Sequence, residues 1–116
     1  MPYVDGFLIA VPSDRKDDYR RMAEEIWPAF RKYGALSTME CWGDDVPDGK
    51  LTSFPMAVKL EPGETVVFSW IVWPDKAARD RCMASMRDDP DFAEPAEMIF
   101  DGKRMIFGGF EPIFEA

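Results

Sequence analysis

Hydrophobic positions cluster in four stretches of the chain, and these stretches predict four β-strands. They are residues 3–11 (YVDGFLIAV), 35–42 (ALSTMECW), 64–73 (ETVVFSWIVW) and 104–115 (RMIFGGFEPIFE). Short apolar runs rich in β-branched and aromatic residues, bounded by Gly, Pro and Asp, are typical of strands. The third run is the strongest. The last run contains Gly108 and Gly109, and because glycine weakens a strand interior, we expect a bulge or a close approach by a partner backbone there.

The segment between the first two predicted strands has the hydrophobic period of a helix. Over residues 14–33 the apolar side chains recur at steps of three and four, which is the spacing of one helix face. Ser13 or Asp14 can cap the start of this helix, and Gly34 suits a left-handed end. Pro28 removes one backbone hydrogen bond, so the pattern also predicts a kink there.

Shorter signals complete the order of elements. Pro74 and Asp75 end the third strand and begin a second helix over residues 75–88. Residues 53–60 fit either a short helix or an edge strand. The helix is favoured, because Ser53 can cap it and Pro55 would lie in its first turn. Residues 91–102 are expected to be loop with one helical turn.

The resulting order, β-α-β-(short element)-β-α-β, predicts one α+β domain over residues 1–116. It matches the ferredoxin-like plan, in which an antiparallel sheet carries two helices on one face. The other face would be open, yet the strands are apolar on both sides, as Phe7 beside Leu8 illustrates. An exposed apolar face of that size predicts an interaction site. A second copy of the chain in a two-fold dimer is the simplest cover.

Four ordered motifs also carry a family resemblance. They are YVDGF near the start, YGAL followed by ECWGDDVPDGK, then VVFSWIVWP, and FDGKRMIFGGFE near the end. Together they resemble the YbaA-like family of small proteins of unknown function, over nearly the whole chain. The resemblance implies a dimeric α/β barrel, in which two ferredoxin-like sheets pack together. It implies no established reaction and no catalytic residues.

Charge and composition exclude several functions. Lys and Arg number 14 against 22 Asp and Glu, which gives a formal net charge of −8. Such a chain repels phosphate backbones, so no nucleic-acid partner is expected. The pattern also leads us to expect neither a signal peptide nor a membrane span, and therefore no membrane partner. With only Cys41 and Cys82, outside any CxxC motif, a cytoplasmic protein with reduced thiols is favoured over a long-range disulfide.

Candidate chemistry is sparse, because histidine is absent. That removes the commonest general base and metal ligand. The acidic loop of Asp44, Asp45 and Asp48 could hold a hard cation, but its spacing favours a solvated turn. No metal and no cofactor are therefore expected.

Three polar residues in the predicted strands are the candidates for catalysis: Asp5, Glu40 and Arg104. A carboxylate that faces a barrel interior is desolvated, and its raised pKa suits acid–base work. The structural alternative is that Asp5 and Glu111 lie near strand ends or pair with Arg104 or with backbone N–H groups. Arg104 could anchor an anionic substrate or fork onto a nearby carboxylate.

Candidate ligand-binding residues come from the strand aromatics and their neighbours: Trp42, Ser69, Trp70, Phe107, Gly108 and Gly109. Trp70 and Trp73 are separated by an odd number of positions, so they cannot share one strand face. The favoured function is a homodimer that binds a small apolar molecule between the sheet and its partner. The alternatives are a cofactor-independent monooxygenase-like or lyase-like enzyme that uses strand carboxylates, and a structural or regulatory dimer without a cavity.

Overall fold

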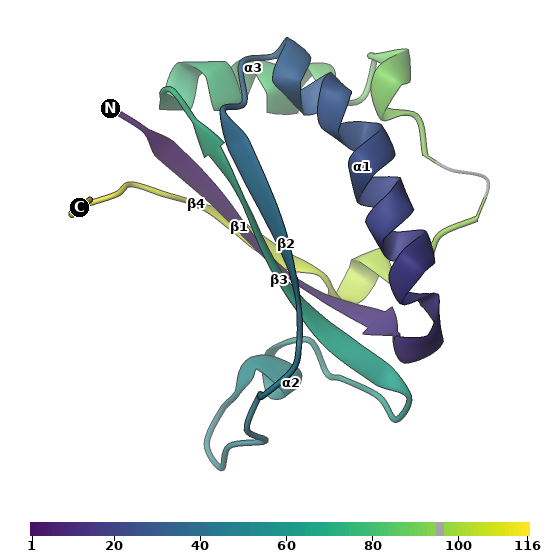
Figure 1. Ribbon diagram of the computed structural model, residues 1–116. Coiled ribbons are helices and arrows are strands. Elements are labelled where there is room, and N and C mark those ends of the chain that lie inside the picture. The colour runs from purple at the N-terminus through teal and green to yellow at the C-terminus, as the bar shows by residue number, and fades with distance from the viewer. Residues whose placement is uncertain (95–96) are drawn as a thin grey trace.

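Four strands form one antiparallel sheet, and two helices cover one of its faces (Figure 1). The computed structural model describes residues 1–94 and 97–116. The strands are β1 (Tyr3–Pro12), β2 (Ser37–Trp42), β3 (Glu64–Trp73) and β4 (Ile106–Phe110), in the spatial order β2-β3-β1-β4. The helices are α1 (Lys16–Lys32), α2 (Phe54–Ala57) and α3 (Lys76–Ser85), with 3-10 turns at Ser13–Arg15, Pro90–Phe92 and Gly102–Arg104. This is the α+β, ferredoxin-like arrangement that the sequence predicts.

The first helix begins later than its sequence pattern indicates. Residues 13–15 form a 3-10 turn, and no side chain caps α1. The predicted cap at Ser13 or Asp14 is therefore wrong, because the Ser13 hydroxyl instead lies 2.7 Å from that of Thr65 at the sheet edge. Pro28 lies inside α1 and does not end it. Gly34, with φ of 102°, takes the expected left-handed conformation.

The two other helices begin at capping side chains, as the sequence predicts. Ser53 accepts a hydrogen bond from the backbone N–H of Met56, so residues 53–60 contain a short helix and not an edge strand. Asp75 accepts from the N–H of Ala78 and starts α3. Each cap satisfies a backbone donor that the first helical turn leaves free.

The last strand is shorter than the apolar run that predicts it. Arg104 lies in the preceding 3-10 turn and Glu111 lies beyond the strand, so neither belongs to β4. The predicted bulge is also wrong. Gly108 faces Gly6 and Gly109 faces Asp5 in an unbroken antiparallel register with β1.

The core lies between the sheet and the helices. Along β3 the residues from Val67 to Trp73 at odd positions point toward α1 and α3, and Trp73 is fully buried. Trp73 packs edge-to-face with Phe30 of α1. Trp70 points to the opposite side, which confirms that the two tryptophans do not share a face.

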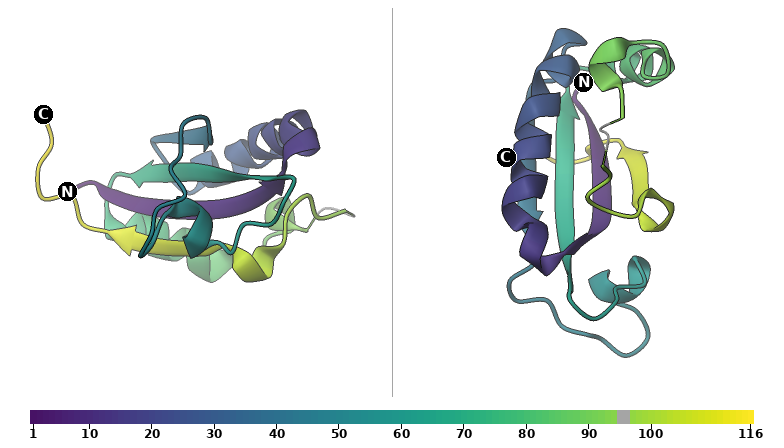
Figure 2. Two further views of the ribbon diagram at one scale, coloured as in Figure 1. Left: turned by 90° about the horizontal axis from the view of Figure 1, so that it is seen from below. Right: turned by 90° about the vertical axis from the view of Figure 1, so that its right-hand side faces the viewer.

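The other face of the sheet is left open by the helices. In the left view of Figure 2, the segment that contains α2 crosses in front of the strands, while α3 lies behind them. Phe54 of α2 packs edge-to-face on Phe68 of β3, with ring centroids 5.9 Å apart. The α2 segment therefore covers one end of the open face and leaves the rest uncovered.

Candidate functional site

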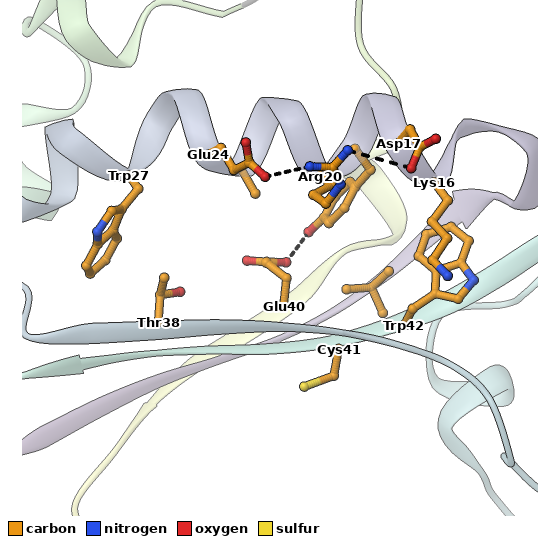
Figure 3. Close-up of a pocket in the computed structure, with 12 residues that line it drawn as sticks. Lys16, Asp17, Arg20, Glu24, Trp27, Thr38, Glu40, Cys41 and Trp42 are labelled. Atoms are coloured by element: carbon orange, nitrogen blue, oxygen red, sulfur yellow. Dashed lines mark hydrogen bonds and ion pairs between the residues drawn. The ribbon is translucent and has the colours of Figure 1, made fainter.

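A pocket of about 330 Å³ lies between α1 and the edge strand β2 (Figure 3). The helix contributes Tyr19, Ala23 and Trp27 from the side that faces the sheet. The strands contribute Glu40 and Val67, together with Thr38 and Trp42 on the same face of β2 as Glu40. The helical period of α1 and the two-residue period of β2 thus place aromatic rings around a carboxylate.

Tyr19 and Glu40 form the polar centre of this pocket. The Tyr19 hydroxyl donates a 2.6 Å hydrogen bond to Oε1 of Glu40. The tyrosine is 4% exposed, whereas the glutamate is an exposed residue of the edge strand. Figure 3 shows the other carboxylate oxygen pointing along the pocket, away from the tyrosine. Among the described residues, no Lys or Arg lies within ion-pair distance of Glu40.

The surroundings change the proton affinity of both groups. Burial by the pocket walls raises the pKa of Glu40, although the hydroxyls of Tyr19 and Ser69 favour its ionised form. Burial and the neighbouring charge of Glu40 raise the pKa of Tyr19 well above its ordinary value. The tyrosine is therefore a donor at neutral pH, and the glutamate is the group that can accept a proton.

The mouth of the pocket carries charges of both signs. Arg20 donates a 2.8 Å hydrogen bond to Glu24 and lies 3.8 Å from Asp17. Lys16 lies over the ring of Trp42, 5.7 Å from its centroid. With Glu40 included, the pocket lining carries two basic and three acidic groups, so its net charge is −1.

Asp5 is not available for acid–base chemistry. It faces the helices, is 3% exposed, and accepts a 2.9 Å hydrogen bond from the indole N–H of Trp73. Arg79 of α3 donates to both of its oxygens, at 3.0 and 3.3 Å. Asp5 therefore lies on the helix side of the sheet, under α3, which agrees with a structural role for this carboxylate.

Arg104 is held in an ion-pair network. Both of its terminal nitrogens contact the Glu64 carboxylate at 2.7 Å, and its Nη1 donates to the Lys59 carbonyl at 3.1 Å. Its Nε reaches Asp101 at 3.2 Å. These bonds join the turn before β4 to the start of β3, so Arg104 holds this end of the sheet together and does not line the pocket between α1 and β2.

A second hollow, of about 590 Å³, lies on the open face of the sheet. Its lining is almost entirely apolar, and six of the side chains are Val4, Leu8, Phe54, Phe68, Ile106 and Phe110. Phe110 is 60% exposed and Phe68 is 43% exposed. We call this hollow the open-face groove.

The structure divides the predicted ligand-binding residues between two places. Trp70, Phe107 and Gly108 line the open-face groove. Trp42 lines the α1–β2 pocket on the other side of the sheet. Ser69 and Gly109 point toward the helices and line neither hollow. Tyr19, which sequence reasoning placed only in an apolar helix stripe, was missed.

Gly109 has a packing role. A Cβ atom added there would lie 2.7 Å from the ring edge of Tyr3 and 2.7 Å from the guanidinium of Arg79. Arg79 also stacks over the Tyr3 ring, 5.4 Å from its centroid. The small size of this glycine is therefore explained by side chains of the same chain, and an approach by a partner backbone stays a prediction.

Other candidate chemistry has no support in the described part of the chain. Residues 1–94 and 97–116 contain no group of three or more acidic or cysteine side chains placed to hold a metal ion. None of their helices is long and apolar enough to cross a membrane. Cys41 and Cys82 are both free, and burial raises the pKa of the Cys82 thiol to about 11, which leaves it unreactive.

Comparison with known families places the chain. Residues 2–102 match the family described as "Protein of unknown function (DUF1428)". The chain belongs to this family. It is 57% identical over 116 residues to the uncharacterized protein YbaA of Escherichia coli strain K12, and 57% identical to that of Shigella flexneri, with 99% of each chain covered. The YbaA-like resemblance in the motifs is thereby confirmed.

Solved structures support the fold. The structure of Rv0793 from Mycobacterium tuberculosis aligns with all of this chain at a TM-score of 0.58 and 16% identity, with 99% of that chain covered. A dimeric ferredoxin-like protein from an uncultured marine organism aligns over the whole of both chains at a TM-score of 0.57 and 11% identity. At these identities the similarity establishes the ferredoxin-like fold and no activity.

Proposed function

We propose that this protein works as a homodimer in which a second copy covers the open sheet face, and that a small apolar molecule binds in the cleft between the two sheets. The open-face groove carries the proposal. Its lining is apolar across three strands and α2, yet side chains such as Phe68 and Phe110 are left in water. Large exposed apolar patches mark interaction sites, because burying them releases ordered water.

The shape of the groove favours a cleft with space for a ligand. Gly6 and Gly108 face each other across β1 and β4, which lets the ring of Phe110 lie against both of them at the floor of the groove. The α2 segment raises one wall through Phe54. A partner sheet laid across such a surface would cover the groove without filling it. The ferredoxin-like relative from the marine organism, described as dimeric, gives independent support for two-fold assembly.

Light scattering after size-exclusion chromatography tests the dimer. The expected result is twice the chain mass at micromolar concentration. Phe68→Glu, which places a charge in the groove, should give a folded monomer. Leu36→Glu is the matched control, because Leu36 is 57% exposed and precedes β2 outside the groove. A monomeric unmodified protein would contradict the proposal.

The ligand is tested separately. Native mass spectrometry of dimer purified from cells without added ligand should show an additional small mass, which organic extraction releases. A dimer that carries none and excludes apolar dyes would instead support a structural or regulatory dimer without a cavity. The cytoplasmic location, with both thiols reduced, is part of the same proposal.

The enzyme alternative depends on one of its three proposed residues. Asp5 and Arg104 are each bound in ion pairs, whereas Glu40 keeps an oxygen directed into a pocket. The observation that favours this alternative is the raised pKa of Glu40, which suits a general base.

A further inference from the structure

The α1–β2 pocket is separate from the open-face groove, since the sheet lies between them. Glu40 and Trp42 line the pocket from the face of β2 that is turned toward α1. Trp70 lines the groove from the other face of β3. The pocket therefore needs its own explanation, which does not depend on whether the chain forms a dimer.

The carboxylate at its centre lacks a cationic partner. Tyr19 supplies one hydrogen bond at 2.6 Å, and the described Lys and Arg side chains lie beyond ion-pair distance. Elsewhere in the described chain, partly buried carboxylates have such a partner. Asp5 has Arg79 and Glu64 has Arg104. Glu40 differs from these structural pairs because it is exposed and its charge is not held in an ion pair within the described chain.

The walls around Glu40 fit an apolar body. Ala23, Trp27, Trp42 and Val67 surround the carboxylate, and the pocket volume is about 330 Å³. Aromatic rings also attract organic cations through the negative face of the ring. Lys16 already lies over Trp42 in this way, which shows that a primary ammonium group fits against one wall.

The net charge of the whole chain also favours a cationic ligand over an anionic one. The chain has a formal net charge of −8, which attracts cations and repels anions. At the pocket mouth Arg20 is paired with Glu24 and Lys16 lies over Trp42, and with Asp17 and Glu40 the lining has a net charge of −1. Anionic ligands are therefore disfavoured, and the pocket offers one acceptor surrounded by apolar walls.

We propose that the α1–β2 pocket is a binding site for a small organic ammonium ion with an apolar or aromatic body, and that Glu40 is its counter-ion. The ammonium group donates to the Glu40 oxygen that points along the pocket, while Tyr19 holds the other oxygen and fixes the carboxylate plane. The apolar body lies between the helix and the edge strand, against Trp27.

Three probes test whether binding requires a positive charge: phenethylamine, phenethyl alcohol and phenylacetate. Each carries a phenyl ring, and they differ in the charge of the polar group. Titrations are followed by NMR of the indole N–H signals. The four tryptophans report on different places, since Trp27 and Trp42 line the pocket, Trp70 lines the groove and Trp73 is buried in the core. The amine should shift the Trp27 and Trp42 signals and bind at least about tenfold more tightly than the alcohol, as expected for a hydrogen bond to a charged group. Phenylacetate should not bind.

Variants locate the effect. Glu40→Gln keeps an acceptor for Tyr19 and should lose about tenfold in amine affinity while alcohol binding stays the same. Glu24→Gln is the matched control, because it removes a carboxylate at the mouth of the same pocket and should change amine binding by less than about threefold. Ala23→Leu should weaken all binding, because it fills the pocket.

Four results would overturn the proposal: equal affinity for amine and alcohol, amine affinity unchanged in Glu40→Gln, shifts confined to Trp70, or no binding of the amine. Circular dichroism of each variant confirms that it is folded. A loss of amine binding in Glu40→Gln with retained alcohol binding cannot come from unfolding, because both probes use the same pocket.

Discussion

The indole N–H of Trp73 donates a 2.9 Å hydrogen bond to Oδ2 of Asp5, and both residues are buried beneath α3. Arg79 completes the arrangement at 3.0 Å from Oδ1. A carboxylate in the middle of an apolar strand is thus explained by the two donors that surround it. This relationship joins β1, β3 and α3, and it makes Asp5 a structural residue.

Replacement of Asp5 by Ala should therefore lower the free energy of unfolding by about 2–3 kcal/mol, because it leaves buried donors without an acceptor. Urea denaturation followed by tryptophan fluorescence measures this. Asp80→Ala is the control, since Asp80 pairs with the same Arg79 at the surface. A loss no larger than that of the control would show that the buried bonds do not stabilise the fold.

The adjacent glycines Gly108 and Gly109 should differ in how well they tolerate substitution by alanine. Gly109→Ala pushes a methyl group into Tyr3 and Arg79 and should destabilise the protein by about 1–3 kcal/mol, as overpacking does. Gly108→Ala places its methyl group 3.5 Å from the Phe110 ring, which is an ordinary contact, and should be tolerated. Thermal unfolding of the pair compares them. Equal destabilisation would contradict the packing role of Gly109.

The Glu64–Arg104 pair should give an acid-dependent contribution to stability. Arg104 lowers the pKa of Glu64 from its ordinary value of 4.5, so the ionised form is favoured in the fold. The contribution is fully present above about pH 4.5 and is lost as the pH falls through the lower folded value. The stability difference between the unmodified protein and Arg104→Ala should therefore be largest near neutrality and shrink in acid. A difference independent of pH would exclude this pair as its source.

Glu40 should show the opposite dependence. Its pKa is raised in the fold, so ionisation opposes folding above the folded value and has no such effect below 4.5. Glu40→Gln removes that ionisation. The variant should consequently gain stability relative to the unmodified protein at pH 7, and the gain should disappear near pH 4, as measured by urea denaturation at both pH values. A relative stability that changes in the other direction would mean that Tyr19 favours the charged form more than burial opposes it.

Sequence patterns predict the element order well because local rules decide it. Ser53 and Asp75 cap their helices, and the apolar run of β3 begins and ends at the predicted residues. The face of each polar strand residue could not be predicted in the same way. Since β1 is apolar on both sides, alternation does not show whether Asp5 points to the helices or to the open face.

Hydrogen-bond partners from distant parts of the chain could not be predicted from the sequence either. Arg79 lies on a helix more than seventy positions from Asp5, and no local rule joins them. Tyr19 fits an apolar helix stripe equally well whether its hydroxyl is bonded or free. One signal was present, since a tyrosine in a buried stripe needs a partner for its hydroxyl, and Glu40 is a polar residue in the strand that follows the same helix.

Ser69 and Trp70 are consecutive in β3, yet one faces the helices beside Glu40 and the other faces the open-face groove. Because side chains alternate along a strand, a substitution in β3 changes the surface on one face of the sheet and leaves the side chains on the opposite face in place. The α1–β2 pocket and the open-face groove can consequently diverge between members of the family at separate rates. A family member that has kept the lining of one of these two surfaces and replaced that of the other would show which surface its function requires.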